Sequence, residues 1–78
     1  MATFSTLDFG IEAGVARITL NRPDSANGIS MQLAQELLQA SLACRCSPRV
    51  RAVLLTGKGR MFCAGGDLNS FVENAAYL

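Results

Sequence analysis

Residues 52–55 form an unbroken apolar run, Ala-Val-Leu-Leu, which ends at Thr56 and Gly57. A strand with one solvent-exposed face alternates between apolar and polar residues, whereas a strand buried on both faces is apolar throughout. The run therefore predicts a strand buried on both faces, as in the sheets of α/β proteins. Such a strand needs cover on two sides, which one or two helices supply poorly.

Other periodic segments surround this strand. The order strand, strand, helix, strand predicts a ββαβ crossover unit, in which the second and third strands run parallel. In the second strand, Ala16, Ile18 and Leu20 share one face, and Val15 and Arg17 share the other. By residue number, the expected strands are about 3–11, 15–21 and 50–56, and the expected helices are about 31–45 and 68–77.

Turn and cap residues mark the ends of these elements. Residues 12–14, Glu-Ala-Gly, predict a hairpin turn, and residues 21–28, with their proline, glycine, Asp and Asn, predict a loop. Ser30 can cap the first helix, and Pro48 disfavours helical geometry in the residue before it. Asp67 can cap the second helix.

The chain is short and apolar. It has 78 residues, of which 50% are hydrophobic and 17% are charged. A domain of this size buries a modest share of its unfolded surface and is marginally stable alone. The excess of apolar residues predicts a single truncated domain over residues 1–78, whose side chains partly bury against structure outside this segment.

Charge and cysteine content exclude several classes of protein. The net charge is +1 and the basic residues are spread along the chain, so nucleic acid is not an expected partner. No apolar run reaches the length of a membrane span, and the first residues lack the pattern of a signal or transit peptide, which favours a cytoplasmic protein. Three cysteines without any histidine do not complete a zinc site, and their odd number fits a reducing compartment.

A glycine-rich turn follows the apolar strand, with the sequence Met-Phe-Cys-Ala-Gly-Gly-Asp-Leu over residues 61–68. Such a turn can aim backbone N–H groups at a carbonyl oxygen and stabilise a developing oxyanion. Phosphate-binding loops are the rival interpretation of the nearby glycines. A Walker A motif needs Ser or Thr after Lys58, where Gly59 stands, and the dinucleotide fingerprint needs glycine where Phe62 stands. Both motifs therefore fail, and a simple turn is the plainer interpretation of Gly57 and Gly59.

Four segments form a set in order and spacing. Residues 62–68 read Phe-Cys-Ala-Gly-Gly-Asp-Leu, and residues 15–23 form a strand that ends in Asn-Arg-Pro. Asn27 follows four residues after that proline, and the helix and the strand at 50–57 come next. This set resembles the enoyl-CoA hydratase/isomerase (crotonase) family, from about Val15 to Phe71. The resemblance implies the N-terminal ββαβ portion of the crotonase fold, an incomplete α/β fold.

The resemblance also implies a substrate and a site. The substrate class would be an acyl-CoA thioester, and the backbone N–H of Ala64 would be one of two donors to the thioester oxygen as an enolate forms. The residues in contact with the CoA would be Arg22, Ala26, Gly28, Ala64, Gly66, Asp67 and Leu68. Gly28 stands where the family most often has alanine. No metal or redox cofactor is implied, and whole family members form trimers or hexamers.

Several candidate residues have plainer interpretations. Arg22 is either a cation suited to the CoA phosphates or a solvated arginine after a strand. Asp67 is expected to act as a helix cap and adenine-side residue rather than as a catalytic acid. Cys63 has no histidine to activate it as a nucleophile. Glu36 and Glu73 are predicted to be surface charges.

The residues that decide the reaction in this family, a second oxyanion donor and acid/base carboxylates, have no counterpart in residues 1–78. Three functions therefore stay open. The chain is the first part of an acyl-CoA hydratase/isomerase of fatty acid metabolism, a non-catalytic CoA-binding module, or an inactive fragment that self-associates through open sheet edges. Further sequence after Leu78 would favour the first, CoA affinity the second, and oligomers without CoA affinity the third.

Overall fold

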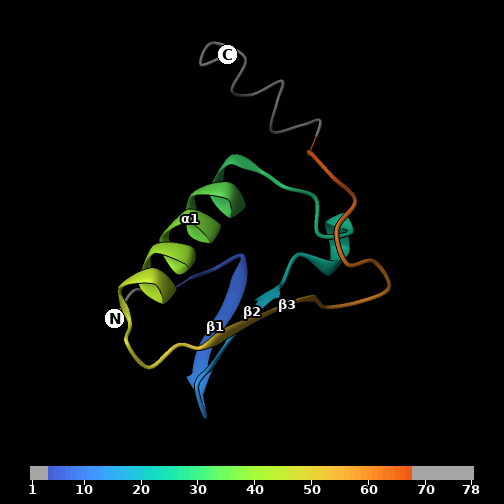
Figure 1. Ribbon diagram of the computed structural model, residues 1–78. Coiled ribbons are helices and arrows are strands. Elements are labelled where there is room, and N and C mark those ends of the chain that lie inside the picture. The colour runs from blue at the N-terminus through green and yellow to red at the C-terminus, as the bar shows by residue number, and fades with distance from the viewer. Residues whose placement is uncertain (1–3, 68–78) are drawn as a thin grey trace.

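The computed structural model describes residues 4–67 (Figure 1). The predicted second helix, at 68–77, lies outside these residues, and so do Leu68 and Glu73. The described elements follow the predicted order. They are β1 (Leu7–Glu12), β2 (Val15–Leu20), the 3-10 helix η1 (Pro23–Ser25), α1 (Met31–Cys46) and β3 (Ala52–Gly57).

Strands β1 and β2 form an antiparallel hairpin, in which Leu7 pairs with Leu20 and Glu12 pairs with Val15. The two residues between the strands, Ala13 and Gly14, both have positive φ values, of 52° and 82°. Two successive left-handed residues make the tight turn whose twist suits a hairpin. The pairing therefore extends one residue beyond the predicted end of the first strand.

The first strand begins later than predicted, at Leu7 rather than near residue 3. The backbone N–H groups of Ser5 and Thr6 each donate a hydrogen bond of 2.9 Å to Oε1 of Glu36, on α1. The Thr6 hydroxyl donates to the same oxygen, and Gln32 donates to Oε2. The prediction that Glu36 is a plain surface charge is wrong, because its carboxylate anchors the chain in front of β1 to the helix.

This environment changes the acidity of Glu36. Its partial burial raises the pKa, but the hydrogen bonds from Thr6, Ser5 and Gln32 favour the charged form and outweigh burial. The net effect holds the pKa of Glu36 below its ordinary value of 4.5.

The third strand pairs in parallel with β2, from Val15 opposite Ala52 to Leu20 opposite Gly57. The sheet order is β1-β2-β3, so β2 is central and β3 lies at an edge of the described sheet. Helix α1 makes the crossover between the two parallel strands (Figure 1). The Ser30 hydroxyl caps this helix, as expected, by accepting a hydrogen bond of 3.1 Å from the N–H of Leu33.

The core lies between α1 and one face of the hairpin. The face of β2 that was predicted to be apolar is buried, with Ala16, Ile18 and Leu20 at most 4% exposed. Leu33 and Ala40 of α1 are fully buried against this face. Burial of such side chains is the main favourable term in folding.

Strand β3 departs from its prediction. Val53 is 52% exposed, and Leu54 and Leu55 are each 45% exposed. Leu55 pairs with Ile18, so it continues the core face of the sheet, yet α1 packs over the β1 side and leaves it uncovered. Within the described residues β3 is therefore exposed, and its burial on both faces stays a prediction about contacts with structure outside this segment.

Candidate functional site

Two loops leave the same edge of the sheet. Because β2 and β3 are parallel and Leu20 pairs with Gly57, the carboxyl ends of both strands lie side by side. The loop after β2, residues 21–30, therefore meets the loop after β3, residues 58–67 (Figure 1). The candidate site is formed where these two loops touch.

A fully buried amide joins the two loops. Asn27 is 0% exposed. Its Nδ2 group donates hydrogen bonds of 2.8 Å to the carbonyl oxygens of Lys58 and Met61, and its Oδ1 accepts one of 2.8 Å from the N–H of Arg22. The backbone of Asn27 is left-handed, with φ of 55°, a conformation that asparagine tolerates better than most residues. The side chain thus fixes both its own loop and the loop after β3.

The end of β3 requires a glycine for a steric reason. A Cβ atom on Gly57 would clash with the carbonyl oxygen of Phe62 and would lie 2.8 Å from Nδ2 of Asn27. The loop folds back so closely that no side chain fits at this position. Gly57 therefore lets the loop return to the buried amide.

The glycine-rich turn then runs beside the first loop. The N–H of Ala64 donates to the carbonyl of Ala26 at 3.0 Å, the N–H of Ile29 donates to Gly65 at 2.7 Å, and the N–H of Asp67 donates to Ile29 at 3.0 Å. Gly66 and Ile29 form a parallel β-bridge. Gly65 has φ of 98°, a conformation open to glycine at no steric cost.

This bridge determines where the Gly66 N–H points. In a parallel bridge, the groups flanking one residue bond to the partner chain, and that residue's own N–H faces the opposite side. The carbonyl of Gly65 and the N–H of Asp67 both bond to Ile29. The Gly66 N–H therefore points away from Ile29, and it donates to no backbone carbonyl within residues 4–67.

An ion pair closes the other side of the site. Nη2 of Arg22 lies 3.0 Å from Oδ2 of Asp67, and Nη1 of Arg22 donates to the carbonyl of Gly28. The two charged side chains are 22% and 17% exposed. Arg22 is thus not a freely solvated arginine, because its guanidinium is held by its own chain.

The structure brings most of the predicted site residues into one cluster. Contacts join Arg22 to Asp67 and Gly28, Ala64 to Ala26, and Gly66 to the same two loops. The seventh, Leu68, lies outside the described residues. Two residues with a large structural part in this cluster, Asn27 and Gly57, were absent from the predicted site. The sign available for Asn27 was its place in the family pattern, four residues after Pro23.

Ala64 is in a different situation from the one predicted. Its N–H is bonded to Ala26 and is not available to another acceptor while that bond lasts. The donor role of Ala64 stays a prediction that requires this bond to open. The Gly66 N–H has the free orientation that such a role needs.

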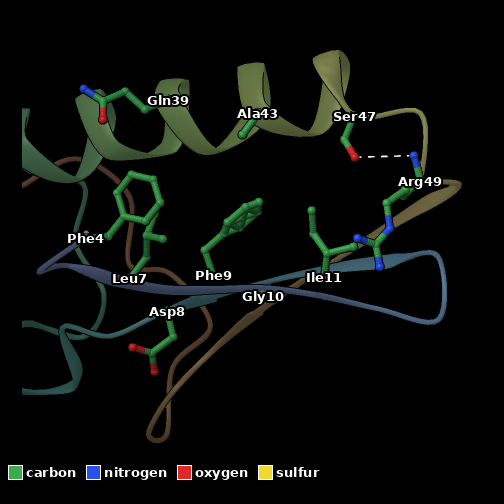
Figure 2. A pocket seen from close by; sticks show the side chains of 10 residues that line it. All are labelled: Phe4, Leu7, Asp8, Phe9, Gly10, Ile11, Gln39, Ala43, Ser47 and Arg49. Carbon is green, nitrogen blue, oxygen red and sulfur yellow. Dashed lines mark hydrogen bonds between the residues drawn. The ribbon is translucent and has the colours of Figure 1, made fainter. Parts of the chain in front are cut away.

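A separate cavity of about 640 Å³ lies between β1 and α1, away from this cluster (Figure 2). Phe9 and Ile11 point from the strand toward the helix, whereas Asp8 points to the other face. Phe4 packs edge-on against Phe9, with ring centroids 6.0 Å apart. None of the predicted site residues lines this cavity.

The three cysteines of the chain add no disulfide to the candidate site. Cys44, Cys46 and Cys63 are unpaired thiols, and Cys63 packs against the core cluster. Residues 4–67 contain no group of three or more His, Cys, Asp or Glu side chains placed to hold a metal ion. The expectation of no metal cofactor stays a prediction. No helix in the described part of the chain has the length and apolar character needed to cross a membrane.

Comparison with known proteins gives consistent results. A family model described as Enoyl-CoA hydratase/isomerase matches residues 10–77. The 3-hydroxyisobutyryl-CoA hydrolase 1 of Arabidopsis thaliana is 40% identical over 74 residues, which is 95% of this chain and 20% of that protein. A putative enoyl-CoA hydratase of Thermus thermophilus is 45% identical over 69 residues, covering 87% of this chain and 27% of that one.

Solved structures show the same likeness. An enoyl-CoA hydratase/isomerase from Mycobacterium paratuberculosis superposes with a TM-score of 0.86 at 36% identity, covering 88% of this chain and 26% of that chain. The enoyl-CoA hydratase EchA8_6 of Mycobacterium marinum gives 0.86 at 38% identity, covering 91% and 34%. The chain thus spans about a fifth to a third of the length of these proteins.

Proposed function

The chain belongs to the enoyl-CoA hydratase/isomerase (crotonase) family, and on that premise we propose that it binds acyl-CoA thioesters and polarises the thioester carbonyl with a backbone N–H. Its three-stranded sheet and helix correspond to a part of the crotonase fold, as the sequence predicted. The proposal concerns binding and polarisation only. The relatives carry the names of a hydrolase, hydratases and an isomerase, so family membership does not single out one reaction.

The observation that carries the proposal is the orientation of the Gly66 N–H. Its neighbours are fastened to Ile29, and the N–H is turned away from that segment without a backbone partner in residues 4–67. A donor held in place before the ligand arrives loses little free energy to reorganisation. Removal of one such donor in other enzymes costs about 3–4 kcal/mol of transition-state stabilisation.

Ala64, the donor that the family resemblance implies, and Gly66 are both candidates for this role. For Ala64 to act, its hydrogen bond to Ala26 has to break, and the carbonyl of Ala26 then loses its partner. Because Ala26 is only half-buried and Ala64 is exposed, water can replace the lost partner, and breaking this bond costs about 0.5–1.5 kcal/mol. In the chain without a ligand, the Ala64 contact with Ala26 aligns the turn with the first loop, and the donor role of Ala64 stays a prediction.

The remaining predicted residues form the wall along which the CoA would lie. Arg22, Gly28 and Asp67 are joined by an ion pair and a backbone contact. A CoA phosphate would compete with Asp67 for Arg22, since both are anions suited to a guanidinium. Leu68, the last residue of the proposed wall, follows directly after Asp67 in sequence.

The test compares two ligands that differ in the thioester. The isotope-labelled 78-residue chain is titrated with acetoacetyl-CoA, an enolisable thioester, and separately with CoA, and amide shifts are followed by NMR. We expect saturable shifts at Gly66 and Asp67 with both ligands and tighter binding of the thioester. Equal affinity for the two ligands, or no binding, would contradict the proposal.

A proline variant isolates the N–H group. Gly66→Pro removes this donor, so we expect the affinity advantage of acetoacetyl-CoA over CoA to disappear while CoA affinity persists. Arg60→Pro is the matched control, because Arg60 also follows a left-handed glycine, Gly59 with φ of 87°. The control is expected to keep the advantage of the thioester.

One observation favours a second candidate function, self-association through β3. This strand lies at the edge of the described sheet, and Val53 and Leu54 are 52% and 45% exposed. An apolar strand edge is a template for pairing with another chain. If this candidate is right, the chain forms oligomers whose mass rises with concentration, measured by sedimentation, and binds neither ligand.

A further inference from the structure

We infer that Asn27 and Gly28 form a deamidation site, which the folded chain protects and which opening of the two loops exposes. An asparagine that precedes glycine is the most readily deamidated asparagine of a flexible chain, because glycine has no Cβ atom to hinder the reaction. Gly28 stands where the family most often has alanine, so this dipeptide departs from the usual family pattern. The inference concerns the covalent stability of the chain and does not depend on the proposed function.

The reaction needs no enzyme, and water is its co-reactant. The backbone nitrogen of Gly28 loses its proton and attacks Cγ of Asn27, and the side-chain nitrogen leaves as ammonia. Water then opens the resulting succinimide ring at either of its carbonyl carbons. One opening gives aspartate, and the other gives isoaspartate, in which the backbone runs through the side-chain CH₂ group. Overall, an amide and a water molecule become a carboxylic acid and ammonia.

The first protected group is the carboxamide of Asn27. Its Nδ2 group donates to the carbonyl oxygens of Lys58 and Met61, and its Oδ1 accepts from the N–H of Arg22. Attack on Cγ requires the carboxamide to turn toward the next backbone nitrogen, and this rotation breaks its bonds to both loops. The side chain is fully buried, so water does not replace the lost partners while the loops stay together.

The second protected group is the backbone nitrogen of Gly28. Its N–H donates to the carbonyl of Ser25 at 2.9 Å, and the proton has to leave this bond before the nitrogen can attack. Gly28 is buried, and its carbonyl accepts a hydrogen bond from Nη1 of Arg22, so the residue is held on both sides. Both reacting groups are therefore released when the two loops separate, and the deamidation rate follows the population of that open form.

Deamidation prevents the loops from closing again in the same way. The product carries a carboxylate in place of the two N–H donors, and this carboxylate faces the carbonyl oxygens of Lys58 and Met61. Those carbonyls lose their donor and gain a repulsive neighbour. Isoaspartate also lengthens the backbone of segment 26–29, whose groups bond to the glycine-rich turn. The reaction is therefore a one-way switch that separates loop 21–30 from loop 58–67.

Peptide mass spectrometry measures the deamidation rate in the full 78-residue chain, in mildly alkaline buffer with and without guanidinium chloride. In denaturant, we expect residue 27 to react faster than the other asparagines, which are Asn21, Asn69 and Asn74. In native buffer, we expect the rate at residue 27 to fall about 10-fold or more, since opening breaks the three hydrogen bonds of the carboxamide. Equal rates in the two buffers would overturn the protection, and a faster rate at another asparagine in denaturant would overturn the site.

Gly28→Ala tests the route of the reaction. A Cβ atom at this position lies 3.2 Å from the carbonyl oxygen of Ser25 and 3.6 Å from Cβ of Asp67, which is a tight fit without a severe clash. In denaturant, where the fold plays no part, we expect this variant to lose the excess rate of Asn27 over the other asparagines. Gly10→Ala, far from the dipeptide in sequence, is the matched control and is expected to keep it. An unchanged rate in Gly28→Ala would overturn the succinimide route.

The switch is tested on chain that has been deamidated in denaturant and returned to native buffer. Hydrogen exchange, followed by NMR, is measured at the N–H groups of Ala64 and Asp67, which bond to Ala26 and Ile29. We expect both to exchange about 10-fold faster than in the intact chain, whereas the amides of β2, the central strand, keep their protection. Unchanged exchange at Ala64 and Asp67, or an equal loss of protection throughout β2, would overturn the separation of the two loops.

Discussion

The guanidinium of Arg22 lies 3.0 Å from the carboxylate of Asp67, a residue 45 positions further along the chain. This ion pair joins the loop after β2 to the end of the glycine-rich turn. Both side chains are less than a quarter exposed, so solvent screens the pair only in part. Its second contact, from Arg22 to the carbonyl of Gly28, ties the same guanidinium to its own loop.

The first prediction concerns this pair. Arg22→Ala and Asp67→Ala each lower the free energy of unfolding, and a double-mutant cycle is expected to give a coupling of about 0.5–1 kcal/mol. Urea unfolding of the four proteins measures it. The exposed pair Lys58–Asp8, 2.7 Å apart and about half exposed, is the control, with an expected coupling near zero. Equal coupling energies for the two pairs would contradict the conclusion that the Arg22–Asp67 ion pair joins the two loops.

The second prediction concerns the steric role of Gly57. A methyl group there would press on the Phe62 carbonyl and on Nδ2 of Asn27. Gly57→Ala is therefore expected to lower the free energy of unfolding by about 1–3 kcal/mol. Gly10→Ala is the matched control, since a Cβ atom on Gly10 in β1 meets nothing within 4 Å. Similar urea midpoints of unfolding for the two variants would contradict the close approach of the Phe62 carbonyl and Asn27 to Gly57.

The third prediction concerns pH and Glu36. The pKa of Glu36 in the folded chain lies below its ordinary value of 4.5, because the bonds from Thr6, Ser5 and Gln32 outweigh the opposing effect of burial. The stabilisation from the charged form is therefore complete above the unfolded value and is lost as the pH falls through the lower, folded value.

Glu36→Gln removes this contribution. The variant is expected to be less stable than the wild type at pH 7, and the difference should shrink as the pH falls below 4.5, measured by urea unfolding across the range. Glu12→Gln, at an exposed position in β1, is the control and should show no such convergence. A constant difference between wild type and Glu36→Gln at all pH values would contradict the anchor.

The fourth prediction compares two leucines on adjacent elements of the sheet. Leu20 is 2% exposed and Leu55 is 45% exposed. Leu20→Ala is expected to lower the free energy of unfolding by about 2–4 kcal/mol, and Leu55→Ala by no more than about 0.5 kcal/mol. Denaturant unfolding at low protein concentration measures both. A large effect of Leu55→Ala would mean that β3 is covered in solution, and its dependence on concentration would then identify self-association as the cause.

Local patterns explain why most of the fold could be predicted from the sequence. The alternation in residues 15–20 places Ala16, Ile18 and Leu20 on one face for any strand, whatever packs against them. Ser30 caps α1 because the cap depends on residues three positions apart. The family pattern placed the candidate site residues in two loops, and the structure brings the six that lie within residues 4–67 into contact.

Long-range contacts explain the rest. Glu36 was predicted to be a surface charge because it lies on the polar side of its helix, and two of its partners, Ser5 and Thr6, lie 30 or more residues away. The apolar run of β3 predicted burial, but a run of apolar residues indicates only that a strand can be buried, not that another element packs on it. Whether cover is present depends on where α1 crosses the sheet.

The amino-acid sequence by itself determined the order of elements, the apolar face of the hairpin, and the family to which the chain belongs, since each follows from periodicity or from short motifs in a fixed order along the chain. Only the tertiary structure decided that, within residues 4–67, the Ala64 N–H has a backbone partner and the Gly66 N–H has none. Ala64 and Gly66 lie in one motif, and nothing in the sequence distinguishes their N–H groups. In the structure, the Ala64 N–H donates to the carbonyl of Ala26, whereas the bridge to Ile29 turns the Gly66 N–H outward. Hydrogen bonds between segments nearly 40 residues apart depend on the register in which two loops meet, and that register is set by the parallel pairing of β2 and β3.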